Sequence, residues 1–332
     1  MIKIAINGFG RIGRAALKIA LTKKNVKVVA INDLADLDNL AYLLKYDSVY
    51  GRYDKSVKVV GKNIVVGKTK IPYYQIAEPN KLPWKKLKVD VALECTGVFK
   101  TKKDASRHLK AGAKNVIISA PAKGDNVATI VKGVNHKIAK DHDVLANASC
   151  TTNCVSPVMA VLEANFGIEK ALLTTIHGLT ASQRTVDLAD KKDWRRGRAA
   201  GSNMIPTTTG AALATALVLP SLKGKFDGMA VRVPLICGSM ADVTVLLKKD
   251  VTEKQINQAF IKATKQPIYK GILETTTDPI VSTDILGNPA SSIVDLSFTK
   301  VVGGNLVKVC AWYDNEWGYA NRLVEMASEL GC

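Results

Sequence analysis

The 332-residue sequence has no long hydrophobic run. No stretch approaches the roughly 18 uninterrupted apolar residues that a membrane-spanning helix requires. Its first apolar run is broken by Asn7, Gly8 and Arg11, and no small-residue cleavage site of a secretory signal follows. The hydrophobic fraction of 47% and the charged fraction of 23% are those of an ordinary globular protein. We therefore expect a soluble, cytoplasmic protein with no membrane partner.

Cysteine and histidine are also scarce. The four histidines leave few candidates for acid–base chemistry, and the six cysteines are too scattered for a disulfide framework. No two cysteines have the CxxC spacing of a zinc site. We expect reduced thiols and no metal. The cysteines are Cys95, Cys150, Cys154, Cys237, Cys310 and Cys332.

Acidic residues are few relative to basic ones. The chain has 29 acidic and 47 basic residues, a formal charge of +18, and only ten of the basic residues are arginine. Such a charge attracts anions, so it could favour phosphorylated substrates or nucleic acid. The lysines are dispersed and are not interleaved with aromatic residues, as a surface for single-stranded nucleic acid requires. We favour a solvated, lysine-rich surface, with nucleic-acid binding as a secondary alternative.

Short β-branched runs alternate with helical patterns through the first 150 residues. "IKIAING", "VKVVAIND", "VDVALECTG", "NVIISAP" and "DVLANAS" predict strands, and "RIGRAALKIAL" predicts a helix. Repeated βαβ units of this kind indicate a parallel sheet covered by helices. The sequence predicts an α/β protein whose Rossmann-type dinucleotide-binding domain spans residues 1–149, joined by a C-terminal helix at about 316–332.

The pattern changes after residue 149. "NCVSPVMAVLEANFG" predicts a long helix that ends near Gly167. "MADVTVLLKK", "SSIVDLSF" and "NLVKVCAWYDN" alternate over a greater length, which favours a mixed or antiparallel sheet. Residues 178–206 are polar and lack periodicity, and a loop of this length is usually functional. We expect an α+β catalytic domain over residues 150–315.

A glycine motif follows the first predicted strand. Gly8, Gly10 and Gly13 form G-x-G-x-x-G between a strand and a helix. These glycines allow a tight turn, close backbone approach to a pyrophosphate, and close packing of helix on strand. Asp33 ends the next strand 20 residues after Gly13, where a carboxylate binds ribose hydroxyls and repels a 2′-phosphate. The motif therefore predicts NAD rather than NADP.

A cysteine nucleophile is the second candidate feature. Cys150 follows a strand at the start of the long predicted helix, a position that favours the thiolate. Among the histidines, His177 ends an apolar strand and is the best candidate for its base, whereas His108, His136 and His142 lie in the first domain. Cys154 lies one helical turn deeper among valines, where we expect it to pack. A metal site formed by Cys150, Cys154 and His177 lacks an evident fourth ligand, so we expect none.

The sequence resembles the glyceraldehyde-3-phosphate dehydrogenase family over essentially its whole length. The matching stretches are "INGFGRIGR", "IND", "ECTGVF", "SAPAK", "GVNH", "NASCTTNC", "WRRGRAA", "IPTTTGAA", "RVP" and "WYDNEWGYANRL". The resemblance implies that the Cys150 thiolate attacks an aldehyde, that a hydride passes to NAD, and that inorganic phosphate cleaves the resulting thioester. It also implies that His177 is the base, and that the protein is a homotetramer.

The resemblance implies further site residues. By similarity, Thr180 and Arg232 bind the substrate phosphate. The attacking phosphate is assigned to Ser149, Thr151, Thr209, Gly210 and Arg196. The cofactor contacts implied are Arg11, Ile12, Ser119, Asn315, which orients the nicotinamide amide, and Tyr319 near that ring, together with Gly8, Gly10, Gly13 and Asp33. A buried structural ion pair is the alternative for Arg232, and a simple polar turn for Thr209.

The sequence departs from the family pattern at a few positions. Pro79 lies near the position where members of the family commonly have an arginine close to the adenine end of the cofactor. In the long loop, Leu188 and Ala189 replace a more usual small-Pro or Leu-Pro pair. "VPLICGSMADV" after Arg232 differs from the usual "VPTPNVSVVDL", which affects expected subunit contacts and local packing. Erythrose-4-phosphate dehydrogenase, which shares the thiol and nucleotide motifs, is the alternative activity.

Overall fold

The computed structural model describes residues 1–124, 127–191 and 193–331, so Cys332 lies outside the described residues. The chain forms two compact units. Unit 1 contains the described residues of 1–130, 136–148 and 320–332, and unit 2 contains those of 131–135 and 149–319. The chain passes from unit 1 to unit 2 between Ala148 and Ser149, one residue before Cys150.

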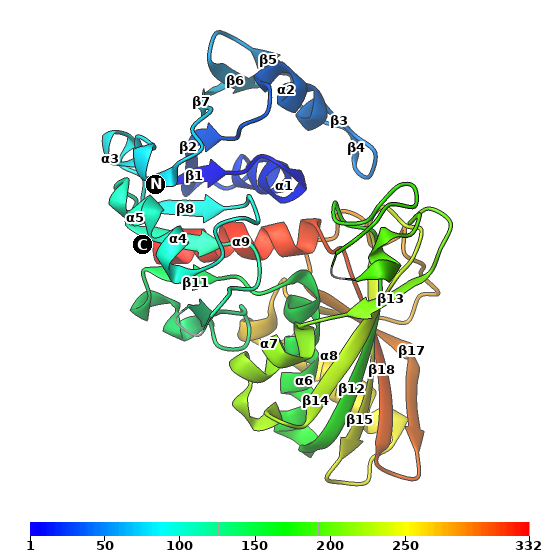
Figure 1. Cartoon of the computed structure of the whole chain (residues 1–332). Helices are drawn as coiled ribbons and strands as arrows, with labels where there is room; N and C mark the ends of the chain where they lie inside the picture. Colours follow the sequence, from blue (N-terminus) through cyan, green and yellow to red (C-terminus); the bar gives the residue numbers. More distant parts are fainter. Residues whose placement is uncertain (125–126, 192, 332) are drawn as a thin grey trace. The chain divides into compact units, whose positions relative to one another are not determined.

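Unit 1 is built on a nine-stranded sheet with the order β10-β11-β9-β8-β1-β2-β7-β6-β5 (Figure 1). All pairings from β10 to β7 are parallel, and β5, β6 and β7 pair antiparallel. The strands are β1 (Ile2–Asn7), β2 (Val26–Asn32), β5 (Val57–Val59), β6 (Asn63–Val66), β7 (Thr69–Tyr74), β8 (Val91–Glu94), β9 (Asn115–Ile118), β10 (Ala128–Thr129) and β11 (Val144–Ala146). A separate hairpin is formed by β3 (Tyr46–Asp47) and β4 (Gly51–Arg52).

Helices connect the parallel strands of unit 1. They are α1 (Arg11–Ala20), α2 (Leu37–Lys45), α3 (Trp84–Leu87), α4 (Lys102–Ala105), α5 (Arg107–Lys110) and the short helices η1 (Pro79–Lys81) and η2 (His136–Asp141). The C-terminal helix α9 (Trp317–Leu330) begins in unit 2 and continues into unit 1. There, Asn25 Nδ2 donates a hydrogen bond to Ser328 Oγ at 2.6 Å, which ties α9 to the start of β2.

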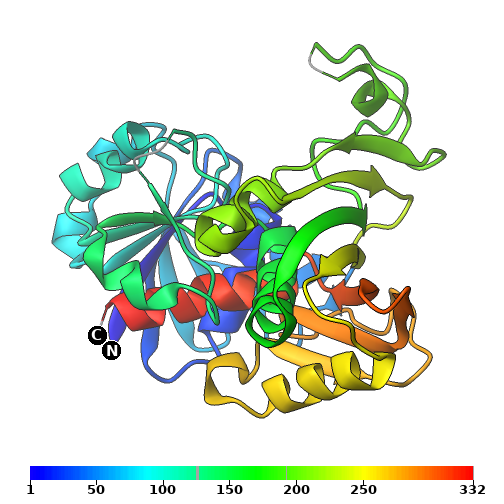
Figure 2. The same cartoon turned by 90° about the horizontal axis from the view of Figure 1, so that it is seen from below.

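Unit 2 is built on a seven-stranded mixed sheet with the order β13-β14-β12-β15-β18-β17-β16. The strands are β12 (Ile168–His177), β13 (Ile205–Thr208), β14 (Phe226–Arg232), β15 (Ser239–Leu247), β16 (Leu273–Thr276), β17 (Ser292–Val302) and β18 (Leu306–Tyr313). The helices are α6 (Cys150–Phe166), α7 (Ala211–Val218), α8 (Glu253–Thr264) and the short η3 (Trp194–Gly197), η4 (Pro220–Leu222) and η5 (Pro267–Tyr269). In Figure 2, α6 and α8 lie along this sheet.

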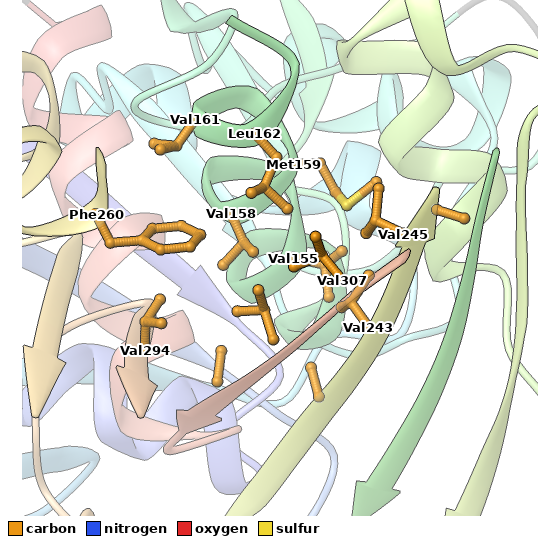
Figure 3. Close-up of a cluster of buried hydrophobic side chains, with 14 of the residues drawn as sticks. Val155, Val158, Met159, Val161, Leu162, Val243, Val245, Phe260, Val294 and Val307 are labelled. Atoms are coloured by element: carbon orange, nitrogen blue, oxygen red, sulfur yellow. The ribbon is translucent and has the colours of Figure 1, made fainter. Parts of the chain in front are cut away.

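The core of unit 2 lies between α6 and the sheet (Figure 3). Val155, Val158 and Leu162 of α6 pack with Val243 of β15 and Val307 of β18, and all five are at most 1% exposed. Each Å² of apolar surface buried in this way contributes about 25 cal/mol, so the five side chains together hold α6 firmly against the sheet. This packing fixes the position of Cys150, the first residue of α6.

The predicted α/β fold class is confirmed: a unit with a largely parallel sheet accompanies a unit with a mixed sheet. The predicted helix after residue 149 is α6, which ends at Phe166 and is followed by Gly167 with a positive φ of 69°. The antiparallel strands β5–β7 have no counterpart among the predicted elements. Residues 178–206 are mainly irregular and contain η3.

Candidate active site

Cys150 is the first residue of α6, and its neighbour Ser149 caps that helix. Ser149 Oγ accepts a hydrogen bond from the Thr152 backbone N–H at 3.1 Å. Such a cap satisfies one of the otherwise unpaired N–H groups of a helix start and fixes where the helix begins. Cys150 is partly exposed, whereas Cys154 one turn later is fully buried.

His177 is the last residue of β12 and faces Cys150. Its Nε2 lies 3.4 Å from the Cys150 Sγ, within range of a hydrogen bond to sulfur. On the other side of the ring, Nδ1 lies 2.6 Å from the Gly178 carbonyl oxygen. We assign the ring proton to Nδ1, which then donates it to this carbonyl. Nε2 is then the acceptor that faces the thiol.

Burial keeps both members of this pair uncharged. Burial, together with the positive charge of Arg232, lowers the pKa of His177 to about 3. Burial also raises the pKa of Cys150, against the opposing effects of Arg232 and of hydrogen bonds with Thr151. The helix start therefore does not by itself produce a thiolate. At neutral pH the arrangement is a thiol beside a neutral imidazole that can take its proton.

Arg232 ends β14, and its side chain lies against His177. The two residues are directly paired in the parallel register of β12 and β14. One guanidinium nitrogen contacts His177 Nδ1 and donates to the Gly178 carbonyl at 3.1 Å. Among the described residues, its buried Nε has no hydrogen-bond partner. An unsatisfied buried donor on a cation suits an anionic group of a substrate.

Tyr313, at the end of β18, packs against His177 and bonds to Thr151, the residue after Cys150. Its hydroxyl makes hydrogen bonds of 2.9 Å with Thr151 Oγ1 and 2.8 Å with Thr175 Oγ1. Its ring meets the His177 ring edge-on, with centroids 5.9 Å apart. Tyr313 is absent from the residues predicted from sequence, although the motif "WYDN" contains it. The residue predicted from that motif is Asn315, two positions further along the chain.

The remaining predicted phosphate ligands are distributed over the loops of unit 2. The Thr180 hydroxyl donates to Gln183 Oε1 at 2.7 Å, and the Thr209 hydroxyl accepts from Ala211 N at 3.2 Å at the start of α7, next to Gly210. Arg196 contacts an acidic residue, because its Nε donates to Thr207 Oγ1 at 2.8 Å and lies 3.5 Å from Asp193 Oδ2. The structure thus brings Cys150, His177 and Arg232 together, and it holds Arg196 against an acidic partner.

Cys154 packs in the core, as its sequence position predicts. Its sulfur lies 3.6 Å from Ser292 Oγ and 3.9 Å from the Ala311 carbonyl. Burial raises the pKa of Cys154 to about 12, so this thiol stays protonated. Among the described residues, no group of three or more histidine, cysteine, aspartate or glutamate side chains could hold a metal ion.

The glycine motif of unit 1 has the shape that a dinucleotide requires. Gly8 has a left-handed φ of +92°, and a Cβ there would lie 2.5 Å from the Thr96 nitrogen. A Cβ at Gly13 would lie 2.1 Å from the Gly8 carbonyl oxygen, so α1 packs tightly on the turn. A Cβ at Gly10 would meet nothing within 4 Å, which leaves its backbone open to a ligand. These features fit a pyrophosphate at the start of α1.

Two charged residues lie beside this turn. The Asp33 carboxylate accepts hydrogen bonds from Phe9 N at 2.6 Å and Ala35 N at 3.0 Å, which holds it next to the glycine turn. Arg11, which precedes Ile12 in α1, forms an ion pair of 2.8 Å with Asp47.

Three further predicted cofactor residues lie at strand or helix ends. Ser119 follows β9, and its N–H donates to the Glu94 carbonyl at 2.9 Å. Asn315 follows β18, and its Oδ1 accepts from Ser239 Oγ at 2.9 Å. Tyr319 is a buried residue in the first turn of α9. Ser119 thus belongs to unit 1, and Asn315 and Tyr319 to unit 2.

Comparisons with known proteins cover both units. Residues 149–315 match the glyceraldehyde 3-phosphate dehydrogenase C-terminal domain, and residues 2–102 match the NAD-binding domain of the same family. The chain is 50% identical to glyceraldehyde-3-phosphate dehydrogenases of Streptomyces coelicolor and Geobacillus stearothermophilus, over 99% of this chain and 98% of each relative. It is 48% identical to glyceraldehyde-3-phosphate dehydrogenase 1 of Saccharomyces cerevisiae, over 98% of both chains.

Proposed function

Because the chain belongs to the glyceraldehyde-3-phosphate dehydrogenase family, we propose that Cys150 and His177 carry out the oxidation of glyceraldehyde 3-phosphate. The protein is an NAD-dependent dehydrogenase that converts this aldehyde and inorganic phosphate to 1,3-bisphosphoglycerate. The observation that carries the assignment is the 3.4 Å approach of the neutral His177 Nε2 to the Cys150 thiol.

The first step forms a bond between sulfur and carbon. His177 Nε2 takes the thiol proton as Cys150 Sγ attacks the aldehyde carbon, and the carbonyl oxygen becomes the oxygen of a thiohemiacetal. The imidazolium formed returns that proton to the oxygen, which gives the neutral thiohemiacetal and a neutral imidazole, and backbone N–H groups at the start of α6 donate hydrogen bonds to the oxygen as its charge develops. His177 then accepts the hydroxyl proton as the carbon loses its hydride.

NAD, when bound, supplies the hydride acceptor for this oxidation. The residues we propose to hold it in unit 1 are Gly8, Gly10, Arg11, Ile12, Gly13, Asp33 and Ser119, together with Asn315 and Tyr319 of unit 2. Support comes from the open backbone at Gly10 and from the placement of the Asp33 carboxylate beside the turn. Accordingly, we assign NAD binding to residues 1–149 with the C-terminal helix, and the thiol chemistry to residues 150–315.

The second step consumes phosphate. A phosphate oxygen attacks the thioester carbon, Cys150 Sγ leaves, and His177 returns a proton to the sulfur. We propose that Arg232 and Thr180 hold the substrate phosphate, which the unsatisfied Arg232 Nε supports. For the attacking phosphate we propose Ser149, Thr151, Thr209 and Gly210, since helices α6 and α7 begin there. Arg196 can join them through its Nη groups, since its contacts with Thr207 and Asp193 use Nε.

We also propose a homotetramer, supported by an uncovered apolar face on the sheet of unit 2. Leu172 is 65% exposed, and the outward-facing Leu306 and the α7 residue Leu217 are 41% and 68% exposed. Leu172 pairs with Thr244 and Leu306 with Leu246, so this face is opposite the core residues Val243 and Val245. An apolar surface of this kind is usually covered by a partner, and a second copy is the natural one in a symmetric assembly.

We place the protein in the cytoplasm, which its free thiols support. Among the described residues, Cys95, Cys150, Cys154 and Cys310 form no disulfide. None of the helices formed by the described residues has the length and apolar character to cross a bilayer. Nucleic-acid binding through the +18 charge remains a secondary proposal, with loss of binding at about 150 mM salt as the outcome that would reject it.

One assay tests the main proposal: NADH formation from glyceraldehyde 3-phosphate with and without inorganic phosphate. We expect sustained turnover only when phosphate is present, because the thioester at Cys150 otherwise accumulates after one turnover. Turnover that is indifferent to phosphate would reject the mechanism. Erythrose 4-phosphate in the same assay tests the alternative activity, and we expect the three-carbon aldehyde to be the better substrate.

A further inference from the structure

Three donors meet at the side-chain oxygen of Asn315. Gly238 N donates to Oδ1 at 3.0 Å, Ser239 Oγ at 2.9 Å, and the Cys237 thiol lies 3.6 Å from the same oxygen. All of these groups are buried in unit 2, with Asn315 6% exposed and Ser239 2% exposed. Three donors on one atom identify that atom as the oxygen of the amide, so the other end of the side chain is the NH₂ group.

The Asn315 NH₂ group is thereby left as a donor for something else. Among the described residues it has no hydrogen-bond partner. An amide whose oxygen is fully used cannot rotate by 180° without placing its NH₂ against three donors, which is costly in a buried site. The arrangement therefore fixes Asn315 as a donor and not an acceptor.

The backbone of the donor segment has the geometry that this role requires. Gly238 has a left-handed φ of +93°, and a Cβ there would lie 2.8 Å from the Ser282 carbonyl oxygen. Only glycine fits this turn, which aims the residue's own N–H at Asn315. Residues 237 and 238 lie in "VPLICGSMADV", the stretch where this chain departs from the family pattern.

Ser239 also reaches the catalytic pair. Its Oγ accepts a hydrogen bond from Gly178 N at 3.1 Å, and Gly178 is the residue whose carbonyl holds His177 Nδ1 at 2.6 Å. A hydroxyl that accepts from one group must turn its proton toward another, here Asn315 Oδ1. Ser239 thus joins the strand end that carries His177 to the amide of Asn315.

We infer that Ser239 is a positioning residue that fixes the Asn315 amide as a hydrogen-bond donor to the carboxamide of the nicotinamide. The inference rests on the proposed function, since it takes Asn315 as the residue that meets this ring. It concerns the orientation of the cofactor and not the reactivity of the thiol. Removal of the Ser239 hydroxyl should then affect NAD use and leave the attack by Cys150 unchanged.

The test combines Ser239→Ala, Asn315→Ala and the double variant, with Ser156→Ala as a matched control. Ser156 is a fully buried serine of unit 2 whose hydroxyl bonds to Thr215 at 3.3 Å instead. Three quantities are measured for each variant: the KM for NAD, the dissociation constant of NAD from quenching of protein fluorescence, and the burst of p-nitrophenol from p-nitrophenyl acetate. The burst reports acylation of Cys150 without any cofactor.

For Ser239→Ala we expect the KM and the dissociation constant of NAD to rise by about threefold to tenfold, the effect of one neutral hydrogen bond. We expect the burst to stay within about twofold of wild type. In the double variant, the KM and the dissociation constant of NAD should equal those of Asn315→Ala alone. Ser156→Ala should match wild type.

Four results would overturn the inference. An unchanged KM for NAD in a folded Ser239→Ala protein would do so, as would fully additive effects with Asn315→Ala. An equal loss of the ester burst would show that Ser239 acts through Gly178 and His177 instead. Asn315→Ala with normal NAD binding would show that the proposed role of Asn315 itself fails. If Ser239→Ala does not fold, Ser239→Cys keeps a weaker donor and gives the same comparisons.

Discussion

The two units each contain a buried histidine next to an ionisable partner, yet only one of them is placed for chemistry. His108 in unit 1 is 0% exposed and His177 in unit 2 is 3% exposed. In each ring both nitrogens have a partner. Burial alone therefore does not distinguish a reactive histidine from a structural one, and the difference lies in the partners.

The partners of His108 are satisfied within unit 1. Trp84 Nε1 donates to His108 Nδ1 at 2.9 Å, so Nε2 carries the proton and donates it to Glu94 Oε2 at 3.0 Å. Glu94 also accepts from Asn7 Nδ2 at 2.6 Å and Thr96 N at 2.8 Å. This network joins the ends of the central strands β1 and β8 beside the glycine turn, and it stabilises the sheet there.

The partners of His177 leave one nitrogen available. The thiol that faces Nε2 is a weak donor, and the Arg232 cation disfavours a proton on the ring. The imidazole is thus held neutral, and its Nε2 faces a proton that it can accept. The fully hydrogen-bonded network around His108 stabilises the fold, whereas the weak contact between Cys150 and His177 leaves both groups able to react.

The largest expected effect is that of Cys150→Ser. We expect turnover with glyceraldehyde 3-phosphate to fall by at least about 10³-fold, because a serine hydroxyl is far harder to deprotonate than a thiol. NAD binding, measured by fluorescence titration, should stay within about twofold, since only the nucleophile changes. Retention of substantial turnover would place the nucleophile elsewhere.

The second effect is that of His177→Asn, which removes the base. We expect kcat to fall by about 10²- to 10⁴-fold, the usual contribution of a positioned base. The remaining rate should rise with pH as Cys150 ionises without help, whereas the wild-type rate depends less on pH near neutrality. Steady-state rates between pH 6 and 9 measure this, and parallel pH profiles would contradict the role of His177.

His177 also makes stability depend on pH in a defined direction. Its pKa falls from the ordinary 6.5 to about 3 on folding, so the unfolded chain binds the proton more readily between these values. The stability it contributes is present above pH 6.5 and is lost as the pH falls toward 3. We expect wild type to lose more stability than His177→Asn between pH 6.5 and 4.5 in urea unfolding. Equal losses would show that this histidine is not held neutral.

The third effect separates the two histidines directly. His108→Ala should lower the free energy of unfolding by about 3 kcal/mol, because it leaves the buried Trp84 N–H without a partner, removes one donor to Glu94 and opens a cavity. We expect kcat per folded molecule to stay within about threefold of wild type, since His108 touches no reacting group. His142→Ala, at a partly exposed position, is the control, with an expected change below about 0.5 kcal/mol in urea unfolding. A large loss of kcat in His108→Ala with normal stability would show that His108, like His177, takes part in the reaction.

The smallest effect is that of Cys154→Ser. The sulfur makes only long contacts to Ser292 and Ala311, and the serine is smaller and more polar. We expect a stability loss of about 1–2 kcal/mol with kcat retained within about twofold, measured by thermal unfolding and steady-state rates. A loss of activity equal to that of Cys150→Ser would mean that both thiols react.

Local signals explain what the sequence predicts well. The glycine turn, the strand before it and the cap at Ser149 depend on residues a few positions apart, so Gly8, Gly13 and Cys150 could be placed from sequence. The contact between Cys150 and His177 spans 27 positions, and the one between Thr151 and Tyr313 spans 162. Such contacts depend on strand register and packing, which short patterns do not encode.

The network around Glu94 and the donors to Asn315 escaped prediction for the same reason. Glu94 lies 87 positions from Asn7, and Ser239 lies 76 positions from Asn315. Their residue types are ordinary for a strand end, and only their meeting in space gives them a role. Burial raises the pKa of Cys150, and this effect could not be predicted from sequence either. The sequence shows that a helix begins at Cys150, which favours the thiolate, but it does not show the core that surrounds the sulfur.

The parallel pairing of β12 with β14 makes the position of Arg232 beside His177 independent of the length of chain between these two residues. His177 and Arg232 are neighbours in register, although 54 residues of loop, strand and helix lie between them in the sequence. Loop closure costs grow only slowly with length, whereas a one-residue slip of β14 would turn Arg232 to the other face of the sheet. Insertions and deletions in the exposed loop after residue 178 can therefore accumulate without moving the guanidinium. A single insertion inside β14 would remove it from the site.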